Sequence, residues 1–287
     1  MTDAERLTSG FVPSIRESPF RIAPERVKAL IAEMGGSAWP LDIVEGRVNF
    51  KALPRTQEIE GTYAALLSLW CVAASARIML VITKTASDLN LEQVVIKPGD
   101  PGFIAIALKN AALALIRNHT SLWTIGELEP DPAAEPLSED GLTNNLFLAA
   151  ASFVILHECG HLVLDHLEYT PLLHQQEREA DSWAVSWILD QAPDEMHRQF
   201  RTLAICIAFI WIGLIDEVRR AGSTHPSAVQ RFGDAFIQFG DVPEDSLALE
   251  VSSYLMKAFF DPTSAIRPPK HALDAFVGQL MVDSRWR

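Results

Sequence analysis

Residues 148–166 read LAAASFVILHECGHLVLDH, an apolar run that contains the motif HECGH at positions 157–161. Side chains four residues apart lie on the same face of an α-helix. His157 and His161 can therefore direct two imidazole nitrogens at a single ion, with Glu158 beside them. The run predicts a helix over about 142–167 that carries a metal site. Because HExxH specifies only three positions, the rest of the chain has to support this interpretation.

Composition limits the class of protein. With 48% hydrophobic and 21% charged residues among 287, the chain has the balance of a folded globular protein and lies outside the disordered range. Its net charge of −13 opposes binding to a phosphate backbone, which requires clustered Lys and Arg. We expect no nucleic-acid partner.

Two further features bear on location. The first 22 residues show no basic start followed by an apolar stretch, so we expect no secretory signal. Three cysteines at wide spacings, Cys71, Cys159 and Cys206, are typical of reduced thiols in a reducing compartment. We expect a cytoplasmic protein.

Two apolar runs could be taken for membrane spans. Residues 203–215 are wholly apolar but too short for a bilayer core, which requires about 20 residues. Residues 63–82 are long enough but include Arg77, and a charge in mid-membrane is unfavourable. Both are predicted to be buried helices without membrane insertion, and membrane association is the alternative.

The N-terminal region has mixed patterning. We expect an irregular arm over 1–22, a short helix over 24–34, a hairpin around Glu45-Gly46, a long helix over 57–84, a β-prone run at 93–97, and a strand or helix ending near 118. Residues 127–141 are acidic and contain three prolines, so they are expected to form a linker or lid.

The C-terminal half is predicted to be almost entirely helical. Beyond the first helix, we expect helices over about 175–191, 193–221, from Pro226, 244–260 and 269–283. The predicted fold is α+β and mostly α-helical. It divides into a mixed region at 1–126 that selects the substrate or partner, the linker at 127–141, and a helical metal-binding domain at 142–287.

A catalytic zinc needs a third protein ligand as well as an open position. The candidates downstream of the motif are His166, His174, Glu177, Glu179 and Asp181. His166 lies five residues past His161, which on a continuous helix directs it away from the ligand face. Glu177 and Asp181 share a face of the next helix, so an antiparallel helix could present Glu177 to the metal. Asp181 could then accept the free N–H of a ligand imidazole. The alternative is a pair of solvated charges near a helix start.

A third motif is THPSAVQRF at 224–232. Pro226 is expected at a helix start, which places His225 at the cap. His225, or Arg231 further along, could stabilise the oxyanion that forms when water attacks a peptide carbonyl. A histidine at a helix cap is more often structural, so this role depends on the two upstream motifs.

Together these motifs resemble the HtpX and CAAX-prenyl-protease family of gluzincin metallopeptidases, in which HExxH precedes ExxxD and then THPxxxxR. The matching residues are His157, Glu158, His161, Glu177, Asp181, His225, Pro226 and Arg231. That family is integral to membranes and has a longer gap between its first two motifs. The short gap here, 15 residues, and the absence of convincing spans also resemble the Lit-type phage-exclusion peptidases.

The resemblance implies zinc held by His157, His161 and Glu177, with Glu158 as the general base and His225 near the reacting carbonyl. We therefore expect a zinc-dependent endopeptidase that hydrolyses an intracellular protein or peptide substrate, in phage defence or regulated proteolysis. Two alternatives remain. One is a membrane-associated quality-control peptidase, and the other is a zinc-containing protein that binds a partner without catalysis.

Overall fold

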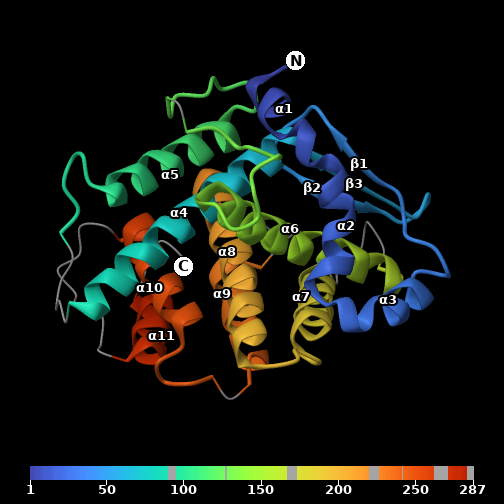
Figure 1. Cartoon of the computed structure of the whole chain (residues 1–287). Helices are drawn as coiled ribbons and strands as arrows, with labels where there is room; N and C mark the ends of the chain where they lie inside the picture. Colours follow the sequence, from blue (N-terminus) through green and yellow to red (C-terminus); the bar gives the residue numbers. More distant parts are fainter. Residues whose placement is uncertain are drawn as a thin grey trace.

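The computed structural model describes residues 1–89, 95–126, 128–166, 173–219, 226–240, 242–261 and 271–282 (Figure 1). Helices make up most of these residues, and one small sheet lies near the N-terminus. This architecture confirms the predicted fold class, α+β and mostly α-helical.

The N-terminal arm is helical, so the prediction of an irregular arm was wrong. Its elements are α1 (Asp3–Thr8), the 3-10 helix η1 (Ser9–Phe11) and α2 (Val12–Ile22). Leu7, Phe11 and Ile15 are spaced four apart, and all three are buried. Pro13 and Pro19 made this helical spacing hard to recognise in the sequence. Pro13, however, lies in the first turn of α2, where its missing N–H breaks no helical hydrogen bond.

The helix predicted over 24–34 is present as η2 (Pro24–Arg26) followed by α3 (Val27–Glu33). The sheet differs from the prediction. Its strands β1 (Leu41–Val44), β2 (Phe50–Leu53) and β3 (Glu58–Thr62) have the order β1-β3-β2. β3 pairs in parallel with β1 and antiparallel with β2, so the predicted β1–β2 hairpin was wrong.

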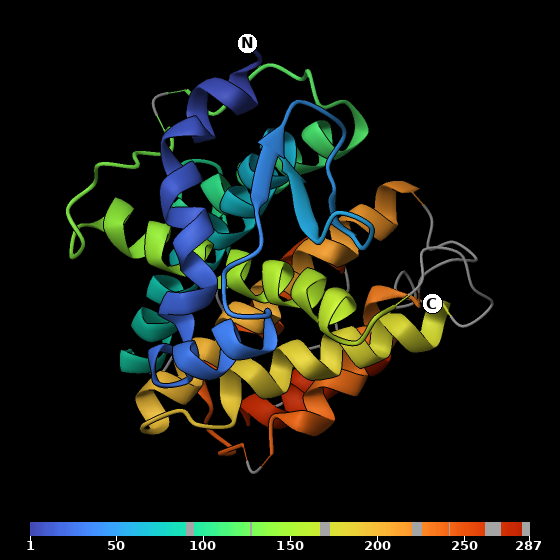
Figure 2. The same cartoon turned by 90° about the vertical axis from the view of Figure 1, so that its right-hand side faces the viewer.

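The missed strand, β3, was expected to belong to the following helix. Its sequence EIEGT contains one large apolar residue, Ile59, and so carries almost no alternating pattern. The hairpin that does form joins β2 to β3 through residues 54–57, where Gln57 takes a positive φ of 53°. As a result, β2 is an edge strand. It lies against helix α6 (Glu139–Val163) (Figure 2).

Two apolar helices follow, α4 (Tyr63–Asp88) and α5 (Pro101–Arg117), which pack against each other. The second apolar run of this region is thus a helix. Residues 95–97 of the predicted strand at 93–97 are not in a strand, and residues 93 and 94 lie outside the described part of the chain.

The C-terminal half contains α6 (Glu139–Val163), α7 (Leu173–Leu189), α8 (Glu195–Arg219), α9 (Ala228–Gln238), α10 (Leu247–Phe260) and α11 (Ala272–Val282). Each corresponds to a predicted helix, with ends shifted by a few residues. Of the linker predicted at 127–141, residues 128–138 are irregular, as the prolines predicted, whereas residues 139–141 form the first turn of α6.

The hydrophobic core draws on both halves of the chain. Helix α4 packs against α6 and α8, and the rings of Phe153 and Phe209 lie 4.9 Å apart where α6 meets α8. The Trp211 indole N–H donates to the Ser68 hydroxyl at 2.9 Å, which links α8 to α4. The division into domains at residues 127–141 stays a prediction.

By length and composition, two described helices could cross a membrane: residues 63–86 and residues 139–163. In each, 78% of the most apolar window is buried inside the protein. The runs at 63–82 and 203–215, predicted to be buried helices, form the buried faces of α4 and α8.

Candidate metal centre

The site lies where α6 and α7 approach each other closely, at Gly160 and Ala180. A Cβ on Gly160 would lie 3.2 Å from the Ala180 Cα, tighter than ordinary van der Waals contact. The glycine inside HECGH and the alanine inside EREAD therefore let the two helix backbones come together. This contact brings Glu177 of α7 to the two histidines of α6.

His157, His161 and Glu177 each offer one donor atom, and these atoms all lie within 4.8 Å of one another. The two Nε2 atoms are 3.1 Å apart, and each is 3.5 Å from an oxygen of Glu177. Tetrahedral zinc with bonds of about 2.0–2.1 Å separates any two of its ligand atoms by about 3.3 Å. The three donors thus have the spacing of three corners of a zinc tetrahedron.

The His157 ring is held from its other side. Its Nδ1 lies 2.9 Å from an oxygen of Asp181, so Nδ1–H donates there and leaves Nε2 free for a metal. Arg231 of α9 donates to both Asp181 oxygens, at 2.7 and 2.8 Å, and its guanidinium lies 3.3 Å from Glu177. We call Asp181 and Arg231 the His157 support.

Four members of this cluster are buried, with His157 6% exposed, Glu177 8%, Asp181 3% and Arg231 6%, whereas His161 is half-buried. Two carboxylates and one guanidinium leave one negative charge unbalanced. Burial alone would lower the pKa of His157, but Asp181 and Glu177 outweigh it and raise this pKa to about 10. A proton is therefore favoured in the place where a cation would bind, and this electrostatic demand fits a metal site.

The same charges act on the carboxylates. Burial alone would raise both pKa values, but the two histidines and Arg231 hold the pKa of Glu177 far below its usual range. Arg231 and His157 likewise lower the pKa of Asp181. Both groups are therefore ionised at neutral pH, as a ligand and its ring partner should be.

Glu158 points to the sheet. One of its carboxylate oxygens accepts the Ala52 backbone N–H at 2.7 Å. Because Ala52 belongs to edge strand β2, this N–H points away from β3 and toward Glu158 on α6. The Glu158 carboxylate is thus held against the edge strand of the sheet.

His161 has a different neighbour. Its Nδ1 is 2.9 Å from Nδ1 of His166, and Nε2 of His166 is 3.1 Å from Glu179. Burial and the nearness of His161 lower the pKa of His166. We call His166 and Glu179 the His161 support. The helical spacing placed His166 on an outward polar face, but the residue is buried because α6 ends before reaching it.

The remaining predicted residues are placed as follows. His174 is exposed in the first turn of α7. His225 lies outside the described residues, so its expected place at a helix cap stays a prediction. Helix α9 starts at Ala228, with Ser227 as its N-cap, close to the start expected from Pro226. The oxyanion role expected of Arg231 also stays a prediction.

Sequence reasoning missed two contacts of the site. The Ala52 amide could not be found, because any residue supplies the same backbone N–H. His166 was weighed only as a ligand, and its contact with His161 depends on how α6 ends. In the sequence, the signal would have been Asp165, because aspartate is one of the few residues that tolerates a left-handed helix end.

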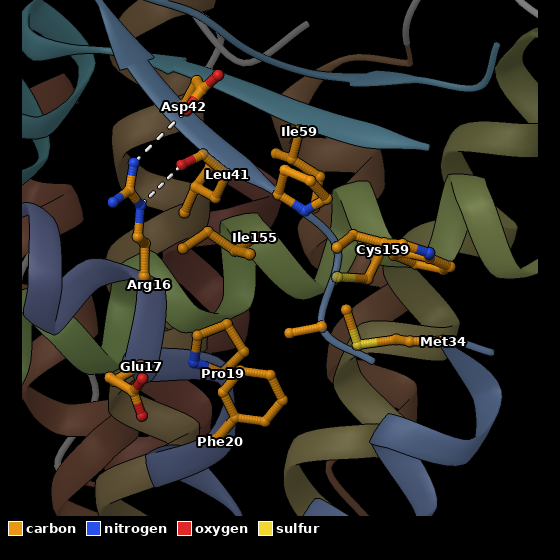
Figure 3. A pocket seen from close by; sticks show the side chains of 13 residues that line it. Arg16, Glu17, Pro19, Phe20, Met34, Leu41, Asp42, Ile59, Ile155 and Cys159 are labelled. Atoms are coloured by element: carbon orange, nitrogen blue, oxygen red, sulfur yellow. Dashed lines mark hydrogen bonds and ion pairs between the residues drawn. The ribbon is translucent and has the colours of Figure 1, made fainter. Parts of the chain in front are cut away.

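A separate cavity of about 240 Å³ lies beside α6 (Figure 3). Cys159 and Ile155 form part of its wall, with Leu41 and Ile59 from the sheet. Residues two apart on a helix do not share a face, so Cys159 points to another side of α6 than His157 and His161. Burial raises the pKa of the Cys159 thiol, which suits an apolar wall.

Comparison with known proteins identifies the family of the chain. The family Peptidase U49 matches residues 59–252, more than half of the chain and all three site helices. The chain is 29% identical over 238 residues to the Cell death peptidase of Escherichia coli (strain K12), covering 76% of this chain and 77% of that protein. No solved structure matches the chain. The resemblance to Lit-type peptidases is thereby confirmed, and the chain is a peptidase that belongs to the Peptidase U49 family.

Proposed function

We propose that this peptidase is a zinc-dependent endopeptidase of the HExxH gluzincin type. The observation that carries the proposal is the spacing of the three donors, 3.1 and 3.5 Å, with Glu158 adjacent on α6. Two imidazoles and one carboxylate are a common donor set of catalytic zinc, and they leave a fourth position open.

When bound, zinc supplies a Lewis acid that polarises the scissile carbonyl and brings the pKa of water toward neutrality. In the proposed reaction, the Glu158 carboxylate takes the proton from the attacking water and passes it to the leaving amine. Asp181 and Arg231 keep the His157 ring in the tautomer whose Nε2 lone pair faces the donor cluster. His225 remains the candidate for stabilising the oxyanion.

The edge of β2 supports an extended substrate. A peptide can add to such an edge through main-chain hydrogen bonds. At this edge the Ala52 N–H donates to the Glu158 carboxylate at 2.7 Å, which places the strand edge directly beside Glu158. A peptide aligned there would run past the donor cluster, and this favours cleavage within a polypeptide over removal of a terminal residue.

For the biological setting, we propose a cytoplasmic enzyme that cleaves an intracellular protein, in phage defence or regulated proteolysis. Support comes from the name of the E. coli relative, Cell death peptidase, and from the three buried cysteines, which form no disulfide. The charge of −13 continues to favour a protein over a nucleic acid as the partner.

The first test is the metal content of protein purified without chelators. We expect one zinc per chain in the wild type and much less in Glu177→Ala. Glu179→Ala should retain far more metal than Glu177→Ala, because this carboxylate is 45% exposed and reaches the site only through His166. Absence of metal from the wild type would overturn the proposal.

The second test separates the base from the ligands. Glu158→Gln should retain zinc. Its rate of hydrolysis of a protein substrate such as casein should fall by several orders of magnitude, since only the proton acceptor is removed. Retained cleavage by this variant would refute the assigned role.

A further inference from the structure

We propose that His166 and Glu179 are positioning residues that orient His161 as a metal ligand through a directed series of hydrogen bonds. The inference rests on the proposed function, since it assumes that His161 binds a metal through Nε2. Neither His166 nor Glu179 belongs to the three-residue donor cluster, so both would act through His161.

The hydrogen bonds from His161 to His166 and from His166 to Glu179 can run in one direction only. If Nε2 of His161 faces a metal with its lone pair, the ring proton is on Nδ1, 2.9 Å from Nδ1 of His166. His166 then accepts at Nδ1 and carries its own proton on Nε2, which donates to Glu179 at 3.1 Å. The other oxygen of Glu179 accepts from the Gln175 amide at 2.7 Å. Every proton meets an acceptor.

The opposite direction, in which His166 donates to His161, is unfavourable at the contact between His166 and Glu179. A neutral His166 that donated from Nδ1 would have a lone pair on Nε2, directed at the negative oxygen of Glu179. That repulsion disfavours the tautomer in which His161 carries its proton on Nε2. Glu179 therefore selects, through His166, the form of His161 that can bind a metal.

The end of α6 builds this contact. Leu164 caps the helix, and Asp165 takes a positive φ of 53°. The His166 N–H donates to the His161 carbonyl at 3.0 Å, and the Asp165 N–H lies 3.4 Å from the Leu162 carbonyl. These two bonds form a Schellman motif, which reverses the chain at the helix end.

The reversal explains the ring contact. On a continuous helix, His166 would point well away from His161, because residues five apart do not share a face. After the turn, the two rings meet edge to face with centroids 5.1 Å apart. His166 is 7% exposed, so the contact is shielded from water, whereas the Glu179 side chain is 45% exposed.

The test measures zinc affinity by competition with a chromophoric chelator, in the full-length protein. For His166→Ala we expect a loss of about 10–100-fold, the range found when the partner of a ligand histidine is removed. Glu179→Ala should weaken affinity in the same direction by a smaller factor. The double variant should be no weaker than His166→Ala, because Glu179 acts through His166.

Cobalt substitution supplies a second readout that overall stability does not move. The visible absorption of bound Co²⁺ should change in His166→Ala and Glu179→Ala, because the orientation of one ligand ring changes. His197→Ala is the matched control, since this exposed histidine of α8 contacts Asp194 and lies outside the site. It should behave like the wild type in both measurements.

The outcomes distinguish the two proposals. If the wild type binds one zinc and both variants bind it equally well, the positioning role is overturned and the proposed function stands. If the wild type binds no zinc, the proposed function fails first. Additive losses in the double variant would overturn the order in which the residues act. Should His166→Ala not fold, Glu179→Ala decides, because its side chain is largely at the surface.

Discussion

The two histidines of HECGH are only four residues apart, yet their surroundings differ in kind. His157 contacts the buried Asp181, which in turn pairs with Arg231. His161 contacts His166, which in turn contacts the half-exposed Glu179. Removing one partner of a buried charge pair lowers the free energy of unfolding strongly, whereas removing a contact that ends at the surface lowers it little. The His157 support should therefore determine stability as well as metal binding, and the His161 support mainly metal binding.

The largest effect is expected from Arg231→Leu. This change leaves Asp181 and Glu177 buried without their guanidinium partner, so we expect the free energy of unfolding of the metal-free protein to fall by about 3–5 kcal/mol. Urea unfolding in the presence of a chelator measures it. The matched control is Arg178→Leu, because Arg178 of α7 pairs at the surface with Asp234 of α9. That exposed pair should contribute less than about 1 kcal/mol. Equal losses would contradict the comparison.

An effect of comparable size concerns pH. The folded-state pKa of His157 is raised to about 10 from an ordinary 6.5, with the carboxylates of Asp181 and Glu177 outweighing burial. A raised pKa contributes stability that is fully present below 6.5 and is lost as pH rises through 10. The Tm of the metal-free protein should therefore fall over this range by several degrees, at roughly 2 °C per kcal/mol for a chain of this length.

Two variants sharpen the pH experiment. Asp181→Asn should flatten the alkaline decline, since it removes the charge that raises the pKa of His157. Zinc-loaded wild type should also show little decline, because a ligand histidine carries no ring proton to lose at Nε2. A metal-free wild type whose Tm does not change between pH 6.5 and 10 would count against the buried charge cluster.

The smallest effect is expected at Asp165, which shapes the His161 support. Its positive φ of 53° suits glycine and is tolerated by aspartate, but it is unfavourable for a β-branched side chain. Asp165→Gly should change the free energy of unfolding by less than about 1 kcal/mol, and Asp165→Val should lower it by about 1–2 kcal/mol. Only the valine variant should also bind zinc more weakly. Thermal melts and zinc titration of the pair check both, and equal behaviour of the two variants would exclude a role for the turn.

The fold was predictable where one strong period ran through a long segment. The helices that became α4, α6, α7 and α8 were all expected from their apolar spacing and their stop residues. Prediction failed where the pattern was short or interrupted. Prolines hid the helical period of Leu7, Phe11 and Ile15, and β3 offered only Ile59 as an apolar signal. Short strands are selected by pairing partners distant in the chain, and spacing carries no information about such partners.

Residue spacing alone was enough to predict the candidate donor set. HECGH places two imidazoles and a carboxylate on one helix, and EREAD supplies Glu177 and Asp181 on the next, since helical spacing of four makes each pair share a face. Tertiary structure decided how those donors are supported. Packing of Gly160 on Ala180 set the distance between the helices, and the turn at Asp165 returned His166 to His161. Pairing of β2 with β3 aimed the Ala52 amide at Glu158. These contacts join segments far apart in the chain or depend on where a helix ends, and local periodicity encodes neither.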